Sequence, residues 1–333
     1  MKKKVFITGG AGYCGSVLVP YLLEAGYFIT VYDMLYFGNC LPVNNKNLNI
    51  IKGDIRDSEK ILSSCKNHDI FISLACTSND ASFDLDEKLS TSVNLDAFEP
   101  MVMAAKAAGI KRFVYASSSS VYGVSSKKNV TEDHPLVPLT LYNKYKGMCE
   151  PILNKHADEE FEVVTFRPAT VCGYSPRLRL DLSVNILTNH AITNNIIKVF
   201  GGDQLRPNLH IIDYCKAVKV LMEAPKSKIF KECFNVGYQN LSILGIANLV
   251  KKIVEKKFPE KKPISIIKTS SDDNRSYHIN SDKIKRILNF SPKLTIENAI
   301  EDLCDAFKKK LIQDSMDNSI YYNVKRFKLL KIK

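Results

Sequence analysis

The sequence contains no stretch that approaches the ~18 uninterrupted apolar residues of a membrane-spanning helix. Three lysines follow Met1, and the chain then enters a predicted strand at residue 4 without the apolar core of a signal peptide. We therefore expect a cytoplasmic protein with no membrane span.

The sequence also lacks any C-x-x-C pair and any Cys and His cluster with the spacing of zinc ligands. Its nine cysteines stand singly, so we expect reduced thiols rather than disulfides, and no metal site. Hydrophobic residues make up 45% of the 333-residue chain, which is enough to bury one large domain and a smaller one.

Acidic residues are in the minority, because 35 Asp and Glu stand against 47 Lys and Arg and leave a net charge of +12. Such a charge can indicate a nucleic-acid partner. Here the lysines are spread along the chain, and only the tail at residues 325–333 concentrates them. We expect no nucleic-acid partner, interpret the tail as a solvated or docking end, and note that a positive surface suits a phosphate-bearing substrate.

A glycine-rich loop follows a β-branched run at residues 4–8 and precedes an apolar helical pattern at 17–25. The loop satisfies G-x-G-x-x-G through Gly10, Gly12 and Gly15, and a variant of the pattern starts at Gly9. Glycine permits the tight turn and the close approach of backbone to a pyrophosphate, and the helix N-terminus offers N–H groups to the anion. The strand before the loop and the helix after it are the context that a dinucleotide site requires.

A second predicted strand at residues 28–32 ends at Asp33, some twenty residues past the loop. An acid at this point accepts hydrogen bonds from ribose hydroxyls and repels a 2′-phosphate, which favours NAD over NADP. Further strands are predicted at 48–52, 69–74 and 112–116, with a long helix at 90–108.

The alternation of strands and helices predicts an α/β fold, a Rossmann-like doubly wound parallel sheet with a smaller α/β substrate-binding domain. Ligands bind beyond the carboxyl ends of such strands. The glycine loop, Asp33, Asp54, Ala75 and the serine run at 117–120 all follow predicted strands, so we expect them to converge on one site.

A tyrosine and a lysine, Tyr142 and Lys146, are four residues apart, which places them on the same face of a helix. A free tyrosine ionises near pH ~10, but an adjacent ammonium stabilises the phenolate and lets Tyr142 accept a proton near neutral pH. A serine hydroxyl that donates to the same substrate oxygen would complete a device for removing a proton from a carbinol while hydride leaves its carbon.

Together these segments resemble those of the extended short-chain dehydrogenase/reductases that act on nucleotide sugars, the NAD-dependent epimerase/dehydratase family. UDP-glucose 4-epimerases are among the members that the chain resembles. The resemblance is carried by residues 8–15, 53–57, 117–123, 142–146 and 167–168, and later by 206–213 and 275–293. It therefore runs nearly end to end.

The resemblance implies that Tyr142 is the catalytic base, that Lys146 is its partner and a ligand of the nicotinamide ribose, and that Ser118 bonds the reacting hydroxyl. It implies NAD as cofactor, with contacts from Gly9, Gly12, Tyr13, Cys14, Gly15, Asp33, Asp54, Ile55, Leu74, Ala75, Asn94 and Lys146. It implies a nucleotide-sugar substrate, with contacts from Thr77, Ser118, Asn185, Arg206 and Arg275. Arginine suits this role because its fork meets phosphate oxygens bidentately.

The resemblance also implies a division of the chain. We expect an NAD-binding domain at residues 1–167 with a return segment at about 209–236, and a nucleotide-sugar-binding domain from 168–208 and 237–333, with substrate in the cleft between them. The stretch 168–208 is predicted to be loop-rich. A homodimer is an expectation from the family alone.

One position helps to choose the reaction. Members that dehydrate at carbons 4 and 6 or decarboxylate a uronic acid place an acid two residues before the tyrosine of the Val-Tyr-Gly segment, and 3,5-epimerases tend to place a cysteine there. This chain has Ser120, and serine cannot readily exchange a proton with carbon. The residue favours a 4-epimerase, while a 4-ketoreductase, a 2-epimerase, a 4,6-dehydratase and a non-catalytic NAD-binding regulatory protein stay open.

Some segments depart from the family pattern. Cys14 replaces a larger aliphatic residue in the glycine loop, and Pro151 lies in the expected catalytic helix. Because proline cannot bond the carbonyl of Gly147, the helix is predicted to kink or end after Lys146. Residues 79–84 and 175–181 also differ from the common 4-epimerase pattern, and we expect them to line the sugar pocket.

Overall fold

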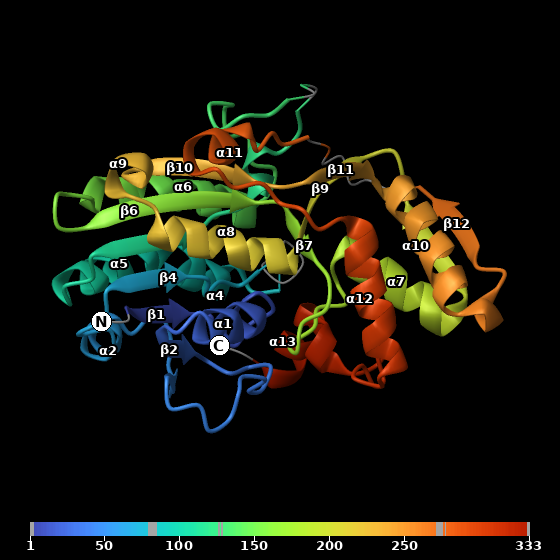
Figure 1. Ribbon diagram of the computed structural model, residues 1–333, viewed down its shortest axis with the longest axis horizontal. Coiled ribbons are helices and arrows are strands. Elements are labelled where there is room, and N and C mark those ends of the chain that lie inside the picture. The colour runs from blue at the N-terminus through green and yellow to red at the C-terminus, as the bar shows by residue number, and fades with distance from the viewer. Residues whose placement is uncertain are drawn as a thin grey trace.

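The computed structural model describes residues 3–78, 85–125, 127, 129–270, 276 and 278–331. It has a larger lobe around a seven-stranded sheet and a smaller lobe around helices α7, α10 and α12, at the left and right of Figure 1. No helix in these ranges is long and apolar enough to cross a membrane.

The seven strands of the larger lobe are all parallel, in the order β10-β6-β5-β4-β1-β2-β3, which confirms the predicted Rossmann-like fold. In β1, Val5 and Ile7 pack into the core on one face of the sheet and Phe6 into the core on the other, because successive side chains of a strand alternate. The strands are β1 (Lys4–Thr8), β2 (Phe28–Asp33), β3 (Leu48–Lys52), β4 (Ile70–Ser73), β5 (Arg112–Ala116), β6 (Glu162–Pro168) and β10 (Glu232–Val236).

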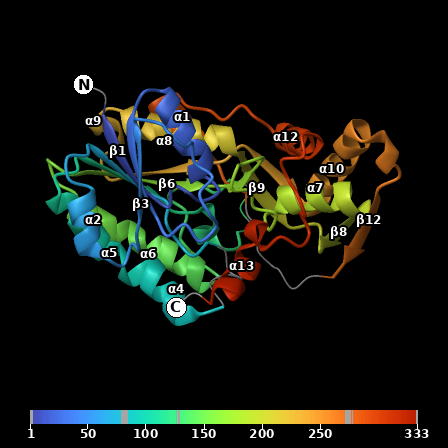
Figure 2. The same ribbon diagram turned by 90° about the horizontal axis from the view of Figure 1, so that it is seen from below.

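Helices cover both faces of this sheet (Figure 2). One face carries α1 (Gly15–Glu24) and α8 (Ile211–Glu223), and the other carries α2 (Ser58–Ser64), α5 (Phe98–Ala107) and α6 (Leu141–His156). The shorter elements of this lobe are α4 (Glu87–Thr91), the π-helical turn η1 (Ser92–Asp96), the 3₁₀ turn η2 (Ser119–Tyr122), α9 (Lys226–Ile229) and α11 (Asp282–Leu288).

The long helix expected at residues 90–108 is interrupted. It is divided into α4, η1 and α5. The extra residue of a π-helical turn changes the direction of the side chains within it. Asn94 in this turn is buried, and its amide accepts from the Thr77 backbone N–H at 2.8 Å and donates to the Thr77 carbonyl at 2.9 Å. The interruption therefore fixes the loop after β4.

The prediction of a loop-rich stretch at residues 168–208 was wrong. The stretch forms β7 (Thr170–Cys172), α7 (Ser183–Asn194), β8 (Ile196–Phe200) and the start of β9 (Leu205–His210). β9 pairs with β7 and β11 (Gln239–Ser242), and β8 pairs with β12 (Ser265–Thr269). A separate apolar core joins α7 to α10 (Ile243–Lys257) and α12 (Ile296–Lys308). The short connections are η3 (Pro259–Lys261) and η4 (Ser319–Tyr321).

The C-terminal helix α13 (Asn323–Leu330) lies at the junction of the two lobes (Figures 1 and 2). The ring of Phe327 packs on Tyr36 and Phe37 with centroid separations of 6.2 and 5.7 Å, and Arg326 Nε donates to the Tyr36 carbonyl at 2.7 Å. Of the two interpretations of the tail, a solvated or a docking end, this helix combines both, because Phe327 and Arg326 dock on the loop after β2 while Lys325 and Lys328 are exposed.

Helix α6 continues through Pro151 to His156, so of the two expected outcomes, a kink or an end after Lys146, the end does not occur. Thr140 caps its first turn by accepting a hydrogen bond from the Asn143 N–H at 3.3 Å. The helix therefore carries Tyr142, Lys146 and Glu150 on a single unbroken stripe of i, i+4 and i+8 positions.

A buried ion pair joins α6 to the sheet. Arg167 of β6 donates through Nε to Glu150 Oε1 at 3.0 Å and through Nη2 to Glu150 Oε2 at 2.6 Å. Ser117 Oγ donates to Glu150 Oε1 at 2.6 Å, and Arg167 Nη1 donates to the Tyr122 hydroxyl at 2.7 Å. Because these groups satisfy one another, the pair can hold α6 and the serine run in one arrangement.

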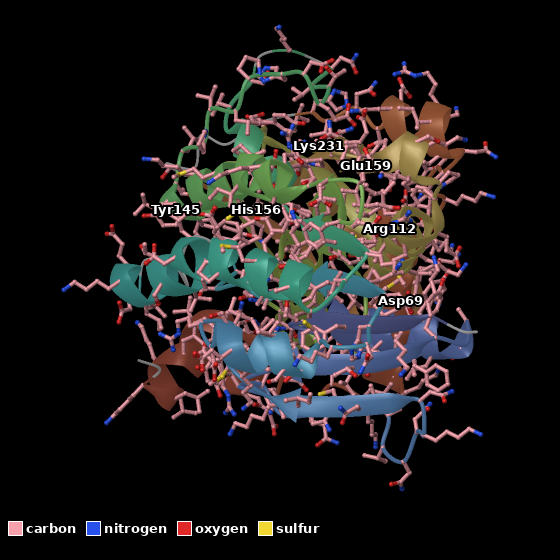
Figure 3. All side chains as sticks on the ribbon, turned by 90° about the vertical axis from the view of Figure 1, so that its left-hand side faces the viewer. Asp69, Arg112, Tyr145, His156, Glu159 and Lys231 are labelled. Carbon is pink, nitrogen blue, oxygen red and sulfur yellow. The ribbon has the colours of Figure 1, made fainter. Side chains whose placement is uncertain are left out.

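Charged groups also make contacts at the amino ends of the strands, on the side of the sheet away from the smaller lobe. Asp69 and Arg112 lie at this end of the sheet (Figure 3). Arg112 donates to Glu162 Oε2 at 2.8 and 2.5 Å and to the Met222 carbonyl at 2.6 Å. Asp69 Oδ2 accepts from the Lys4 N–H at 2.8 Å. These contacts fix the amino ends of the strands, and the cavity described below lies at their carboxyl ends.

We predict that Glu150→Ala lowers the free energy of unfolding by about 3–5 kcal/mol, because it leaves Arg167 charged and buried without its carboxylate. Urea denaturation followed by circular dichroism measures this. The matched control is Glu159→Ala: Glu159 pairs with Lys226, its side chain is 90% exposed, and the change should leave the midpoint nearly unchanged. Equal effects of the two substitutions would contradict the role assigned to the buried pair.

Candidate active site

A cavity of about 910 Å³ lies at the carboxyl ends of the strands, between the two lobes. Most of the residues singled out in the sequence contribute to its wall. These are Gly9, Gly12, Tyr13, Cys14, Gly15, Asp33, Asp54, Ile55, Leu74, Ala75, Thr77, Ser118, Tyr142, Lys146 and Arg206. Segments far apart in the chain thus meet at one site, as the rule for parallel sheets requires.

Two predicted contact residues, Asn94 and Asn185, are absent from the described part of the cavity wall. Asn185 is completely buried. Its Oδ1 accepts from the Gly173 N–H at 3.1 Å, and its Nδ2 donates to the Arg179 carbonyl at 2.9 Å and to the Tyr13 hydroxyl at 3.1 Å. The two asparagines therefore support the residues that face the cavity. Arg275 lies outside the described residues, as do 79–84.

The glycine loop has the geometry that its sequence predicts. Gly9 has a φ of +74°, and a Cβ there would lie 2.6 Å from the Ala75 backbone nitrogen. A Cβ on Gly15 would lie 2.4 Å from the Gly10 carbonyl oxygen. Helix α1 starts at Gly15, and no side chain caps its N-terminus, which leaves this end for an anion.

Two acids lie beside the loop. The carboxylate of Asp33 accepts from the backbone N–H groups of Ala11 at 3.0 Å and Leu35 at 2.8 Å. Burial raises the pKa of Asp33, and these bonds oppose the shift. Burial would also raise the pKa of Asp54, but hydrogen bonds from Arg56 lower it. A fixed carboxylate at the end of β2 fits the ribose of a dinucleotide.

Tyr142, the base predicted from the sequence, is half-buried on the cavity wall in the first turn of α6. Lys146 is 6% exposed, and its Nζ donates to the Ala116 carbonyl at 2.8 Å and lies 5.1 Å from the centroid of the Tyr115 ring. The end of β5 therefore holds the ammonium in place on the helix face that carries Tyr142.

Ser118 is held by Ser120, a residue that stood out in the sequence only because it replaces an acid. Its Oγ lies 2.7 Å from Ser120 Oγ and accepts from the Ser120 N–H at 3.2 Å, and Ser120 Oγ donates to Asn143 Oδ1. Ser120 thus bridges Ser118 to the residue beside Tyr142. The i, i+2 spacing of hydroxyls in the serine run was the available signal.

Arg177 and Arg179 were not singled out as ligands from the sequence, although the segment 175–181 that contains them was expected to line the sugar pocket. Both line the cavity, with exposures of 3% and 8%. Asn323 and Phe327 of α13 join them on the wall. The alternating arginines before Asp181 were a visible signal, but nothing in the sequence showed which part of the cavity they face.

This fold and this wall are those of a dinucleotide-binding enzyme of the extended short-chain dehydrogenase/reductase type. The model of the NAD dependent epimerase/dehydratase family matches residues 5–237, and the chain belongs to this family. The resemblance inferred from the sequence is thereby confirmed.

Relatives in the family carry out different reactions. The chain is 28% identical to a UDP-glucose 4-epimerase of Lactobacillus helveticus, with 92% of this chain and 96% of that protein aligned. It is also 28% identical to a dTDP-D-glucose 4,6-dehydratase of Mus musculus, with 92% and 89% aligned. Its fold matches MoeE5, solved in complex with UDP-glucuronic acid and NAD, with a TM-score of 0.80, 24% identity and coverage of 92% and 99%.

The family is NAD-dependent, and the residues present fit that cofactor: a loop that only glycine allows, an uncapped helix N-terminus and a fixed acid at the end of β2. The protein is therefore an NAD-dependent enzyme of the nucleotide-sugar epimerase/dehydratase family.

We predict that Tyr142→Phe lowers turnover by roughly 10²–10⁴-fold, the usual loss when a general base is removed. NAD affinity should stay near wild type, because the ring that lines the cavity is kept. Tyr145→Phe is the matched control: Tyr145 is on the same helix, its hydroxyl accepts from Thr91 at 3.4 Å, and it does not line the described cavity. Near-normal turnover in Tyr142→Phe would remove Tyr142 from the chemistry.

A double-mutant cycle tests the bridge made by Ser120. Because Ser120 acts through Ser118, Ser120→Ala should lower turnover less than Ser118→Ala, and the double variant should be no slower than Ser118→Ala alone. Turnover of the three variants under substrate saturation measures this. Additive losses would show that Ser120 has a role of its own.

Proposed function

We propose that the protein is an NAD-dependent nucleotide-sugar 4-epimerase. The observation that carries the proposal is Ser120, which occupies the position where dehydratases and decarboxylases of the family have an acid. Its hydroxyl is engaged with Ser118 and Asn143, so it holds the hydroxyl partner in place and supplies no proton to a leaving group.

Carboxylates elsewhere on the described cavity wall are engaged with other groups. They are Asp33, Asp54 and Asp181. Asp33 accepts two backbone N–H bonds, Asp54 pairs with Arg56, and Asp181 pairs with Arg179 at 2.8 Å. Dehydration needs an acid to protonate the departing hydroxyl. Within the described residues, no acid beside Ser118 supports that step.

In the proposed reaction the same groups act in the oxidation of carbon 4 and in its re-reduction. The glycine loop, the N-terminus of α1 and Asp33 would hold NAD, which would supply the hydride acceptor and donor for carbon 4 of the sugar. Tyr142 takes the proton of the 4-hydroxyl and later gives it back, while Ser118 holds the oxygen by a hydrogen bond. Lys146 places positive charge beside the phenolate form of Tyr142. The cycle leaves no net redox change.

Positive groups of the smaller lobe are proposed to hold the substrate diphosphate. Arg206, Lys198 and His190 line the cavity there. Burial, and then the charge of Lys198, lower the pKa of His190, so the charge at neutral pH comes from the other two. Arg275 and Thr77 stay proposed contacts of the substrate. The homodimer and the two-domain division likewise stay proposals.

The alternatives within the family are a 4,6-dehydratase, a 4-ketoreductase and a 2-epimerase. A mouse relative is a dTDP-D-glucose 4,6-dehydratase, and a solved neighbour is a complex with UDP-glucuronic acid. The serine at position 120 argues against the 4,6-dehydratase, whereas a 4-ketoreductase or a 2-epimerase would also tolerate it, so identification of the product separates these two from the 4-epimerase.

We predict that an NMR survey of UDP-, GDP-, CDP- and dTDP-sugars in D₂O with catalytic NAD will show one pair of carbon-4 epimers interconverting without deuterium at carbon 4. Hydride transfer within the site carries the same hydrogen off and back, which is the reason for this expectation. Deuterium at carbon 5 or 6 with loss of water would identify a dehydratase. Stoichiometric consumption of NADH would identify a reductase, and a change at carbon 2 a 2-epimerase.

A further inference from the structure

Arg177 and Arg179 keep hydrogen-bond donors that no described residue accepts. Both are more than nine-tenths buried and line the cavity. Arg177 Nε, Arg177 Nη1 and Arg179 Nη2 have no partner among the described residues. Buried guanidinium donors are costly when unpaired, so this arrangement fits a bound anion, because no group of the described residues supplies the acceptor.

The two arginines lie beside the glycine loop. The backbone N–H of Arg177 donates to Ser16 Oγ, in the first turn of α1, at 3.3 Å. Burial raises the pKa of Cys14, which precedes α1, to about 12, and the charges of Arg179 and Arg177 oppose that shift. The backbone of Arg177 is thus bonded to the first turn of α1, and both side chains line the same cavity as the glycine loop.

Other contacts hold the arginines in place. Arg177 Nη2 donates to Asn323 Oδ1 at 2.5 Å, and its guanidinium carbon lies 3.5 Å from the centroid of the Phe37 ring. Arg179 donates through Nε to Asp181 at 2.8 Å and through Nη1 to Ser78 at 3.1 Å. Each side chain is anchored on one side and has a donor left on another, as in a preorganised anion site.

We propose that Arg177 and Arg179 form a second half of the diphosphate site for NAD, opposite the glycine loop and the N-terminus of α1, with Asn323 of α13 as the residue that positions Arg177. The ligand is the diphosphate group, a dianion that matches two guanidinium charges. The proposal rests on the NAD dependence of the family and not on the choice of reaction.

The position of Arg177 favours the cofactor over the nucleotide sugar as the source of the diphosphate. Phe37 and Ser16 place it by the loop after β2 and by α1, near Asp33, whereas Arg206 and Lys198 belong to the smaller lobe. A 2′-phosphate is disfavoured because Asp33 would repel it. Burial and the charge of Arg179 lower the pKa of Arg177 to about 9, which a bound anion would reverse.

Binding measurements on the full-length protein freed of nucleotide test the proposal. Isothermal titration with NAD, NADP, ADP-ribose, adenosine, UDP and dTDP compares the wild type with Arg177→Met. Loss of a charge-assisted contact should weaken NAD and ADP-ribose by about 10–100-fold and leave adenosine, UDP and dTDP unchanged. The exposed Arg286 of α11 provides the control, and Arg286→Met should change none of these affinities.

Asn323→Ala should weaken NAD and ADP-ribose in the same pattern and to a smaller degree, because it releases Arg177 from its anchor. Arg177→Lys keeps the charge without the fork, so it should recover part of the affinity. Thermal unfolding of each nucleotide-free variant checks folding, and if Arg177→Met does not fold, Arg177→Lys and Arg179→Lys carry the test through their losses of NAD affinity.

Four results would overturn the proposal. A loss confined to UDP and dTDP would move the arginines to the substrate, and a wild-type preference for NADP that disappears in Arg177→Met would move Arg177 to a 2′-phosphate. An equal loss for adenosine would show that Arg177 only shapes the surface of Phe37. Unchanged NAD affinity would leave the arginines without this role. Since no sugar chemistry is measured, failure of the epimerase assignment would not affect the outcome.

Discussion

The buried ion pair between Arg167 and Glu150 is the contact on which the rest of the site depends. Two charges withdrawn from water are tolerated only when their remaining hydrogen bonds are also made, and Ser117 and Tyr122 make them here. Glu150 lies one helical turn beyond Lys146, which lies one turn beyond Tyr142. Because Lys146 and Glu150 both bind the end of β5 or its loop, α6 cannot slide along the sheet, and Tyr142 keeps its place on the cavity wall that Ser118 also lines.

Much of the cofactor half was predictable because its requirements are local. A glycine is required at position 9 because this residue has a positive φ and its backbone approaches Ala75 closely. Asp33 reaches the site because it stands at the end of its strand. Parallel strands then bring such ends together whatever lies between them. The Tyr142 and Lys146 pair was predictable for the same reason, since a helix fixes the separation of positions four apart.

What was not predictable depends on contacts between distant segments. Asn94 and Asn185 were assigned to ligands because their positions match the family, yet their amides are used by Thr77, Gly173 and Arg179. Lysines dominate the tail, so the sequence could not distinguish a solvated end from a docking end. The contacts of Phe327 with Tyr36 and Phe37 show that this part of the tail packs on the loop after β2. The fate of Pro151 also required the structure, since packing along α6 overrides the lost backbone bond.

The positive charge that first suggested a polyanionic partner has a local use at this cavity. Arg177, Arg179 and Arg206 line it together with Tyr142. A positive charge near a tyrosine favours its phenolate form. Bound anions would offset the charge of these arginines but leave Lys146 on the helix face that carries Tyr142. In the proposed reaction Tyr142 would take and return a proton beside the charge that Lys146 places on the same helix, without a second acid.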